Sequence, residues 1–159
     1  MTSRERIIAA VSRQRPDKVP KDISWGFTPA IMATFREKTG QDDPNEYFGV
    51  DVRFVGLDIP PERIAAEEER RREAFSRYYP QLPPAATISE WGTAHLPGSL
   101  LHFTRIVPPM SGFVSLKELE EYPFPSFDEE WRRLHAAARI RECHEKGLAV
   151  GGAMATTIF

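Results

Sequence analysis

A run of uncharged residues near the carboxyl end constrains the fold more than any other feature. It covers Leu148 to Met154 and reads LAVGGAM. It follows the longest predicted helix, residues 127–146, with Gly147 as the helix stop. A short apolar run of this kind is typical of a strand buried in a parallel sheet. Because a helix that leads into a buried strand is half of a β-α-β unit, the sequence predicts an α/β fold with a strand over residues 148–154.

The amino-terminal residues predict a helix followed by a first strand. Thr2 and Glu5 have the spacing of a capping box, which predicts a helix over residues 3–14. Pro16 ends this helix, and an extended segment over residues 19–25 is expected to be the first strand.

One face of this predicted helix carries its apolar stripe. Ile7, Ala10 and Val11 fall on that stripe, and the charged residues, Arg6 among them, are expected on the other faces.

Three further helices and a strand are predicted before residue 80. Thr28-Pro29 and Asp43-Pro44 are each a cap followed by a proline at the first helical position, and Gly40 is placed to end the first of the two helices. Residues 50–57 alternate as a strand does. The charged segment over residues 62–79 is expected to be a solvated helix, and a partner-binding face is the alternative.

Two β-like runs predict a hairpin over about residues 85–110, with its turn at Pro97-Gly98. Further along the chain, Ser115 with Glu118 and Ser126 with Glu129 have the capping-box spacing. The second of these pairs is expected to open the long helix over residues 127–146.

Charge and composition limit the classes of partner. The formal net charge of −2 gives no electrostatic support for binding nucleic acid or an anionic membrane. No apolar run is long enough for a membrane span or a signal peptide. The single cysteine, Cys143, excludes an internal disulfide and fits a reducing compartment, so a cytoplasmic protein is expected.

No metal-binding spacing is present in the sequence. His135 and His144 are nine residues apart on the predicted long helix and face opposite sides. Cys143 and His144 diverge on that helix, and neither C-x-x-C nor H-E-x-x-H occurs. A metal site built only from this chain is not expected.

Two groups of residues are candidates for substrate binding. His95, His102 and Arg105 lie on the two arms of the predicted hairpin, where they would bind an anionic group; the alternative is a polar face turned to water.

The second group, Asp22, Trp25 and Phe27, lies at the carboxyl end of the predicted first strand. Such positions line the active site in (β/α)-type barrels. Core packing of the two aromatic residues is the alternative, as is a turn hydrogen bond accepted by Asp22.

The order of the motifs resembles the uroporphyrinogen decarboxylase family, which includes corrinoid-dependent methyltransferases. The resemblance covers most of the chain and is carried by TSRERIIAAVSRQRPDKVP, TPAIMATFREKTG with YFGVD, WGTAHLPGSLLHFT, YPFPSFDEEW and KGLAVGGAM. It implies the N-terminal portion of a (β/α)8 TIM barrel with an inserted β-hairpin, a barrel that 159 residues cannot close. It also implies either a carboxy-lyase acting on a tetrapyrrole or a corrinoid-linked methyltransferase.

One departure from the family bears on the activity. Decarboxylases carry an R-Q-A-G-R-Y-like motif after the first strand, whose arginines hold substrate carboxylates. Residues 24–29 of this chain read SWGFTP instead. The resemblance implies no cofactor held within this chain; a methyltransferase would use zinc and a corrinoid, with His and Cys ligands beyond Phe159.

A non-catalytic hypothesis stands beside the enzymatic one. The chain ends on the apolar sequence ATTIF, which suggests a truncated chain. An unclosed barrel leaves unpaired sheet edges, and such edges favour a homo-oligomer or a partner that completes the barrel. The chain would then be a remnant or an assembly module.

Overall fold

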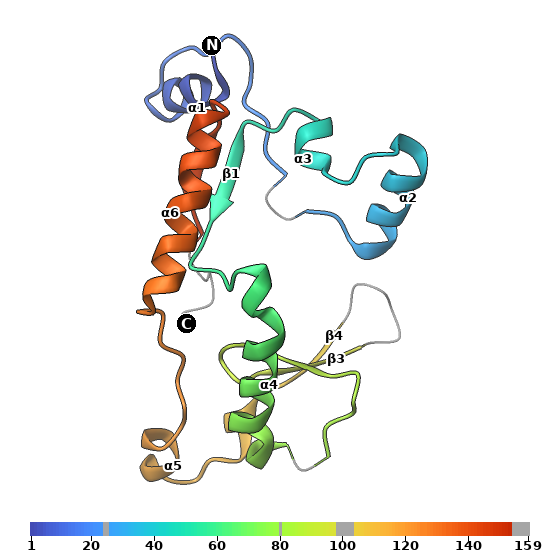
Figure 1. The fold of residues 1–159 in the computed structure, drawn as a ribbon, viewed down its shortest axis with the longest axis vertical. Coiled ribbons are helices and arrows are strands. Elements are labelled where there is room, and N and C mark those ends of the chain that lie inside the picture. Colours follow the sequence, from blue (N-terminus) through green and yellow to red (C-terminus); the bar gives the residue numbers. More distant parts are fainter. Residues whose placement is uncertain (24–25, 80, 98–103, 154–159) are drawn as a thin grey trace. The chain divides into compact units, whose positions relative to one another are not determined.

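The computed structural model of the chain describes residues 1–23, 26–79, 81–97 and 104–153, which form a mixed α/β structure with one parallel and one antiparallel sheet (Figure 1). It divides into two compact units, Met1–Asp58 with Asp128–Phe159 and, inserted between these two parts, Ile59–Phe127. The elements of the first unit are α1 (Ser3–Val11), α2 (Pro29–Thr39), α3 (Pro44–Tyr47), β1 (Val52–Val55), α6 (Glu130–Glu145) and β5 (Ala149–Gly152). Those of the second are η1 (Pro61–Arg63), α4 (Ile64–Phe75), η2 (Ser76–Tyr78), β2 (Thr87–Ile88), β3 (Ala94–Pro97), β4 (Thr104–Val107), η3 (Pro109–Gly112) and α5 (Leu116–Glu120).

The first unit is built on a parallel pair of strands. β1 and β5 run parallel, with Val52 opposite Ala149, and α6 lies along β1 and contacts both strands (Figure 1). Gly147 ends α6 at a φ of 67°, and the chain then turns directly into β5. The predicted order of long helix, glycine and parallel strand is therefore confirmed, but the strand is shorter than predicted and only Ala149 in it is buried. Met154, the last residue of the predicted strand, lies outside the described residues.

Most helix ends are where the sequence predicts them. Thr2 and Glu5 form the expected capping box on α1, and Ser115 forms another on α5. Thr28 caps α2 and Asp43 caps α3, each followed by proline. These signals are local, so a sequence pattern is enough to find them.

Two helix ends differ from the prediction. The long helix α6 begins later than the predicted residue 127, with Glu129 as its N-cap, and the Glu129 carboxylate pairs with Arg132 at 2.9 Å. The first helix ends at Val11 instead of residue 14, because Arg13 adopts a left-handed conformation with a φ of 58°.

The predicted first strand is wrong over the part that the structure describes. Residues 19–23 form no strand, and Val19 is 83% exposed. Pro20 has no N–H to donate, and the Lys21 N–H donates to the side chain of Asp51 at 2.8 Å instead of to a neighbouring strand. The Lys21 carbonyl accepts a backbone hydrogen bond from the Asp51 N–H, and the Ile23 carbonyl accepts one from the Gly26 N–H.

The apolar stripe of the first helix is only partly buried, with Ile7 and Ala10 half-buried. Val11 is 75% exposed, whereas Arg6 is only 6% exposed. Ala9 is the apolar residue of α1 that is buried. The helix turns its buried face toward Arg6 because the guanidinium finds two carboxylates there.

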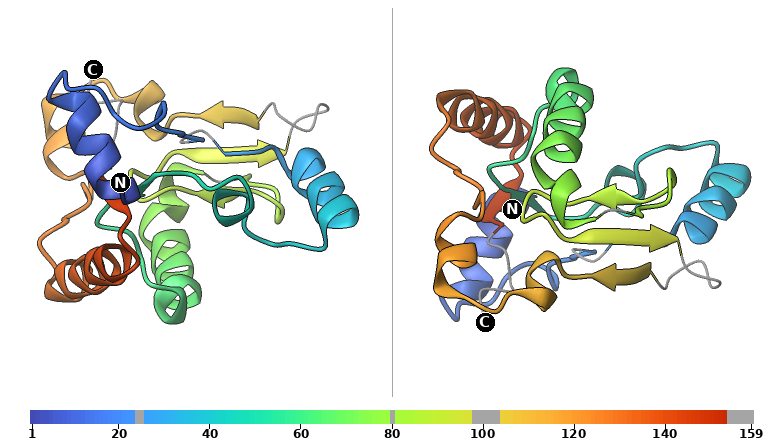
Figure 2. Two further views of the ribbon diagram at one scale, coloured as in Figure 1. Left: turned by 90° about the horizontal axis from the view of Figure 1, so that it is seen from above. Right: turned by 90° about the horizontal axis from the view of Figure 1, so that it is seen from below.

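The second unit contains a three-stranded antiparallel sheet in the order β2-β3-β4. β3 and β4 lie side by side in both views of Figure 2 and form a hairpin, whose connection, residues 98–103, is outside the described residues. The predicted turn at Pro97-Gly98 is wrong at Pro97, which is the last residue of β3 and pairs with Thr104. A tight turn at Gly92 adds β2 as a further strand that the sequence analysis did not separate.

An aromatic core supports this sheet. Phe75, Ile88 and Tyr122 are buried together. The Tyr79 hydroxyl lies 2.6 Å from the Gly92 carbonyl and accepts a hydrogen bond from the Ala94 N–H. The helix α4 buries only Phe75 and is otherwise largely exposed, as expected of a solvated charged helix.

The predicted barrel is not confirmed by the structure. The described residues contain a two-stranded parallel sheet and a three-stranded antiparallel one, and no closed barrel is formed among them. The α/β class holds at this coarser level.

Gly92→Ala should destabilise the second unit by about 3 kcal/mol, as judged from a left-handed conformation costing 1–2 kcal/mol together with overpacking. Gly92 has a φ of 76°, and a Cβ there would lie 2.2 Å from the Tyr122 hydroxyl oxygen. The measurement is urea unfolding followed by circular dichroism. Gly112→Ala is the matched control, because a Cβ at Gly112 meets no described atom within 4 Å. Equal stabilities of the two variants would contradict this account of the core.

Candidate functional site

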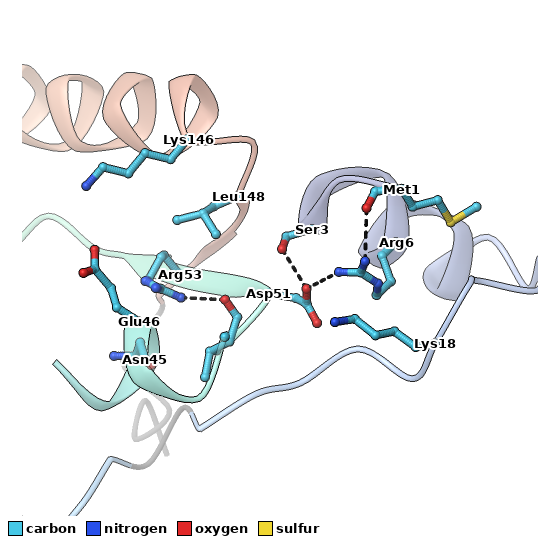
Figure 3. A pocket seen from close by; sticks show the side chains of 12 residues that line it. Met1, Ser3, Arg6, Lys18, Asn45, Glu46, Asp51, Arg53, Lys146 and Leu148 are labelled. Carbon is cyan, nitrogen blue, oxygen red and sulfur yellow. Dashed lines mark hydrogen bonds and ion pairs between the residues drawn. The ribbon is translucent and has the colours of Figure 1, made fainter. Parts of the chain in front are cut away.

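The described residues of the first unit form a polar pocket of about 470 Å³ (Figure 3). Its walls come from α1 and the segment after it, from α3 and the residues that lead into β1, from β1 itself, and from the turn that leads from α6 into β5. It therefore lies at the amino ends of the two parallel strands.

A buried ion pair forms the floor of the pocket. Nη1 of Arg6 donates to Oδ1 of Asp51, which is 1% exposed, and Ser3 Oγ donates to the same oxygen at 2.7 Å (Figure 3). The other carboxylate oxygen accepts from the Lys21 N–H at 2.8 Å. Arg6 also pairs with Asp17, with distances of 2.6 Å from Nε and 2.9 Å from Nη2. Each charged side chain in this floor is therefore hydrogen-bonded, either to a side chain of opposite charge or to a neutral donor.

The pKa values of these groups shift in the directions that the pairing requires. The hydrogen bond from Arg6 holds the pKa of Asp17 well below its usual range. Burial alone would raise the pKa of Asp51, but hydrogen bonds from Ser3, the Lys21 amide and Arg6 outweigh it, so this pKa is lowered as well. The pKa of Arg6 is raised, chiefly by its hydrogen bond to Asp17. All three groups stay charged at neutral pH.

The rim of the pocket carries further charges. Lys18, Arg53 and Lys146 are cationic, and Glu46 is anionic (Figure 3). Nη1 of Arg53 donates to the carbonyls of Val50 and Val52, at 2.9 and 3.1 Å. Lys146 pairs with Glu142 at 2.8 Å, and this pairing raises the pKa of Lys146.

The buried residues of the floor are suited to stabilising the fold and to binding a ligand, and not to proton transfer. Asp51 is a weak base because its pKa is lowered, so it would not activate the Ser3 hydroxyl that donates to it. Among the residues that the structure describes, no three His, Cys, Asp or Glu side chains are grouped so that they could hold a metal ion.

The carboxyl ends of β1 and β5 have a different character. Nη1 of Arg132 donates to the Leu57 carbonyl at 2.6 Å, which fixes the turn after β1 to α6. A Cβ at Gly151 would lie 2.7 Å from the Phe54 ring. The glycine there makes room for an aromatic ring of the same unit. In open parallel sheets ligands bind at this end of the strands.

The structure describes two of the three candidate residues predicted at the end of the first strand, Asp22 and Phe27. Trp25 lies outside the described residues, and Asp22 is exposed. The ring of Phe27 packs 6.2 Å from the rings of both Phe35 and Phe48, which fits the core-packing alternative. Substrate contact by these residues stays a prediction.

The predicted hairpin group is not assembled among the described residues. His102 lies outside them. His95 is opposite Ile106, whereas Arg105 is opposite Leu96. Because successive residues of a strand point to opposite faces, His95 and Arg105 lie on different faces of the sheet, and one anion on one face does not reach both.

The sequence analysis missed the floor of the pocket. Arg6 stands directly before a run of apolar and small residues, IIAAV, that supports more than one stripe. Its partners Asp17 and Asp51 are separated from it by 11 and 45 residues. Two acidic residues gave the available signal. Asp17 stands two residues before the predicted first strand, and Asp51 directly precedes Val52, the first residue of β1.

Comparisons with protein-family models, with curated proteins and with solved structures produced no match to this chain. Among the described residues, no helix combines the length and apolar character that crossing a bilayer requires.

Acid should destabilise the first unit. Asp17 and Asp51 have lowered pKa values in the folded chain, so the unfolded chain binds more protons in acid. The free energy of unfolding should stay level between about pH 7 and pH 5 and fall below about pH 4, the ordinary carboxyl range. Urea unfolding at a series of pH values measures this.

Asp51→Asn tests the same carboxylate directly. It should lower the free energy of unfolding at neutral pH by about 3 kcal/mol, since it leaves a buried arginine without one partner. Its stability should also depend less on acid. Asp42→Asn is the control, because Asp42 forms an exposed pair with Arg36 and its removal should cost less than about 1 kcal/mol. Identical acid dependence in wild type and Asp51→Asn would refute the assignment.

Proposed function

We propose that this chain is the N-terminal part of a protein similar to the uroporphyrinogen decarboxylase family, and that the whole protein is a corrinoid-linked methyltransferase. In this proposal β1 and β5 are strands of a (β/α)8 barrel. The second unit is an insertion between one barrel strand and the helix that precedes the next. Decarboxylation of a tetrapyrrole is the other activity that the family resemblance implies.

The parallel pairing of β1 with β5 is the observation that carries the proposal. The strands are far apart in sequence, yet they are hydrogen-bonded neighbours in register from Val52 to Val55. The helix α6 leads into β5 and contacts both strands. Strand, helix and parallel neighbour is the repeating step of a (β/α) barrel.

The family named in this proposal rests on the order of the motifs in the sequence. The capped first helix, the Thr28-Pro29 helix and the long helix before β5 occur in the order on which the resemblance rests. The unit Ile59–Phe127 contains the hairpin and lies between β1 and α6 in the sequence, and in this proposal it is the inserted part.

The residues after Ile23 favour methyl transfer over decarboxylation. The decarboxylases' arginines would follow the first strand, and this chain has SWGFTP there. The described aromatic of that segment, Phe27, packs against Phe35 and Phe48. An aromatic in this position offers no fork of N–H donors to a substrate carboxylate.

The protein encoded by the complete reading frame that contains this chain should bind a corrinoid and zinc. Purified protein is mixed with cob(I)alamin or methylcobalamin, the visible spectrum is followed, and zinc is measured by mass spectrometry. Transfer of the methyl group to a thiol is the expected activity. Consumption of uroporphyrinogen without corrinoid binding would replace it with decarboxylation.

A variant pair locates the substrate site. Asp22→Asn should raise the KM of whichever reaction is found by roughly tenfold, as expected for a lost hydrogen bond to a polar substrate group. Asp42→Asn removes an exposed carboxylate of the same unit and should leave KM unchanged. Protein that neither binds a corrinoid nor consumes uroporphyrinogen would overturn both enzymatic versions.

A non-catalytic assembly module is the second candidate, and the exposure of β1 favours it. Phe54 is 45% exposed on β1, although parallel strands are normally covered on both faces. In this version the chain would be completed by a second polypeptide. The same purified protein would then form a stable complex in sedimentation analysis and show neither enzymatic activity.

A further inference from the structure

The geometry points to a second ligand site: the polar pocket at the amino ends of β1 and β5 binds a small organic dianion, a phosphate ester or a dicarboxylate. Ligands of α/β proteins normally bind at the carboxyl ends of the parallel strands. This site lies at the opposite end, so it is separate from the substrate site proposed above and its role is stabilising or regulatory.

The pocket has the size for such a ligand. Its volume of about 470 Å³ lies within the range that small-molecule sites occupy. Its floor, made by Arg6 and Asp51, is almost completely buried. A ligand placed here would contact residues from α1, the loop before β1, and the turn before β5.

Its charge balance favours an anion. The lining contains four cationic side chains and two anionic ones, Asp51 and Glu46. The floor pair of Arg6 and Asp51 is neutral within itself. Lys146 is occupied by Glu142, with Glu46 also near enough to raise its pKa. The charged lining residues that remain are Lys18, Arg53 and the anionic Glu46, so this part of the lining has a net charge of +1, and its two cations can each pair with one charge of a dianion.

The donors of these two residues are available. Arg53 is half-buried, and only its Nη1 is used, by the carbonyls of Val50 and Val52. Its Nε and Nη2 have no acceptor among the residues described here. The exposed ammonium of Lys18 likewise has no ion-pair or hydrogen-bond partner in the described part of the chain. A half-buried guanidinium with free N–H groups binds carboxylate or phosphate oxygens strongly.

Other occupants fit less well. The Asp51 carboxylate already accepts from Ser3, Arg6 and the Lys21 amide, so it has little capacity left for a metal cation. The chain as a whole has a net charge of −2, so the local positive charge is not part of a broad basic surface of the kind that tracks nucleic acid.

Binding should stabilise the first unit. The lining residues are far apart in sequence and come together only in the folded chain, so a dianion would bind the folded state and not the unfolded one. Addition of the ligand should therefore raise the melting temperature in a concentration-dependent, saturable way.

The test uses the 159-residue chain with four probes: inorganic phosphate, pyrophosphate, succinate and citrate. Isothermal titration calorimetry and thermal unfolding are run at constant ionic strength, with chloride as the reference anion. Saturable binding and a raised melting temperature are expected with at least one probe. The two phosphate probes and the two carboxylate probes distinguish between the chemical classes of ligand.

Single substitutions test whether the anion binds in this pocket. Arg53→Gln should weaken it by roughly tenfold or more, as expected for lost charge-assisted hydrogen bonds. Lys18→Gln should weaken it less because Lys18 is exposed, and Glu46→Gln should strengthen it by removing a repelling charge. Lys38→Gln is the matched control, since it removes an exposed cation of the same unit that does not line the pocket.

Two results would overturn the site. One is the absence of saturable binding for every probe relative to chloride. The other is an equal loss of affinity in Lys38→Gln and Lys18→Gln, which would mean that the ion responds to overall charge. Lys18 is exposed, so its substitution should leave the fold intact and the comparison valid even if Arg53→Gln unfolds. Neither result depends on whether the protein binds a corrinoid.

Discussion

The first unit depends on the buried contact between Arg6 and Asp51. Removing two charges from water costs several kcal/mol per ion, and only good geometry with additional hydrogen bonds compensates for it. Here the compensation comes from Asp17, Ser3 and the amide of Lys21. The contact therefore joins α1, the turn after it and the residues before β1 into a single hydrogen-bonded network.

The same network positions the parallel sheet. The main-chain carbonyl of Asp51 accepts from the N–H of Ala149, the first residue of β5, at 3.1 Å. The N–H of Arg4 donates to the carbonyl of Gly147 at 2.9 Å, so α1 is also bonded to the turn that precedes β5. With its amino end held in this way, the pair of strands has one rigid end. In the proposed barrel the substrate would bind at the other end of the strands.

The sequence predicted what depends on neighbouring residues and missed what depends on distant ones. The caps at Thr2, Thr28 and Ser115 follow from contacts three residues away, and each is present. The burial of Arg6 could not be found in this way, because hydrophobic periodicity treats every arginine as a surface residue and the partners that permit burial are remote in sequence. The faces of His95 and Arg105 depend on the strand register, and a one-residue change in register reverses a face.

The glycines of β5 show why a correct local prediction still leaves the site open. A glycine pair in a buried strand indicates a close approach by a ligand or by another part of the protein. At Gly151 the approaching group is the ring of Phe54, so that space is filled from within the unit. At Gly152 a Cβ would meet no described atom within 4 Å. Among the described residues, therefore, Gly152 and not Gly151 has no neighbour at its Cβ position, at the end of the strands where a substrate of the proposed barrel would approach the backbone.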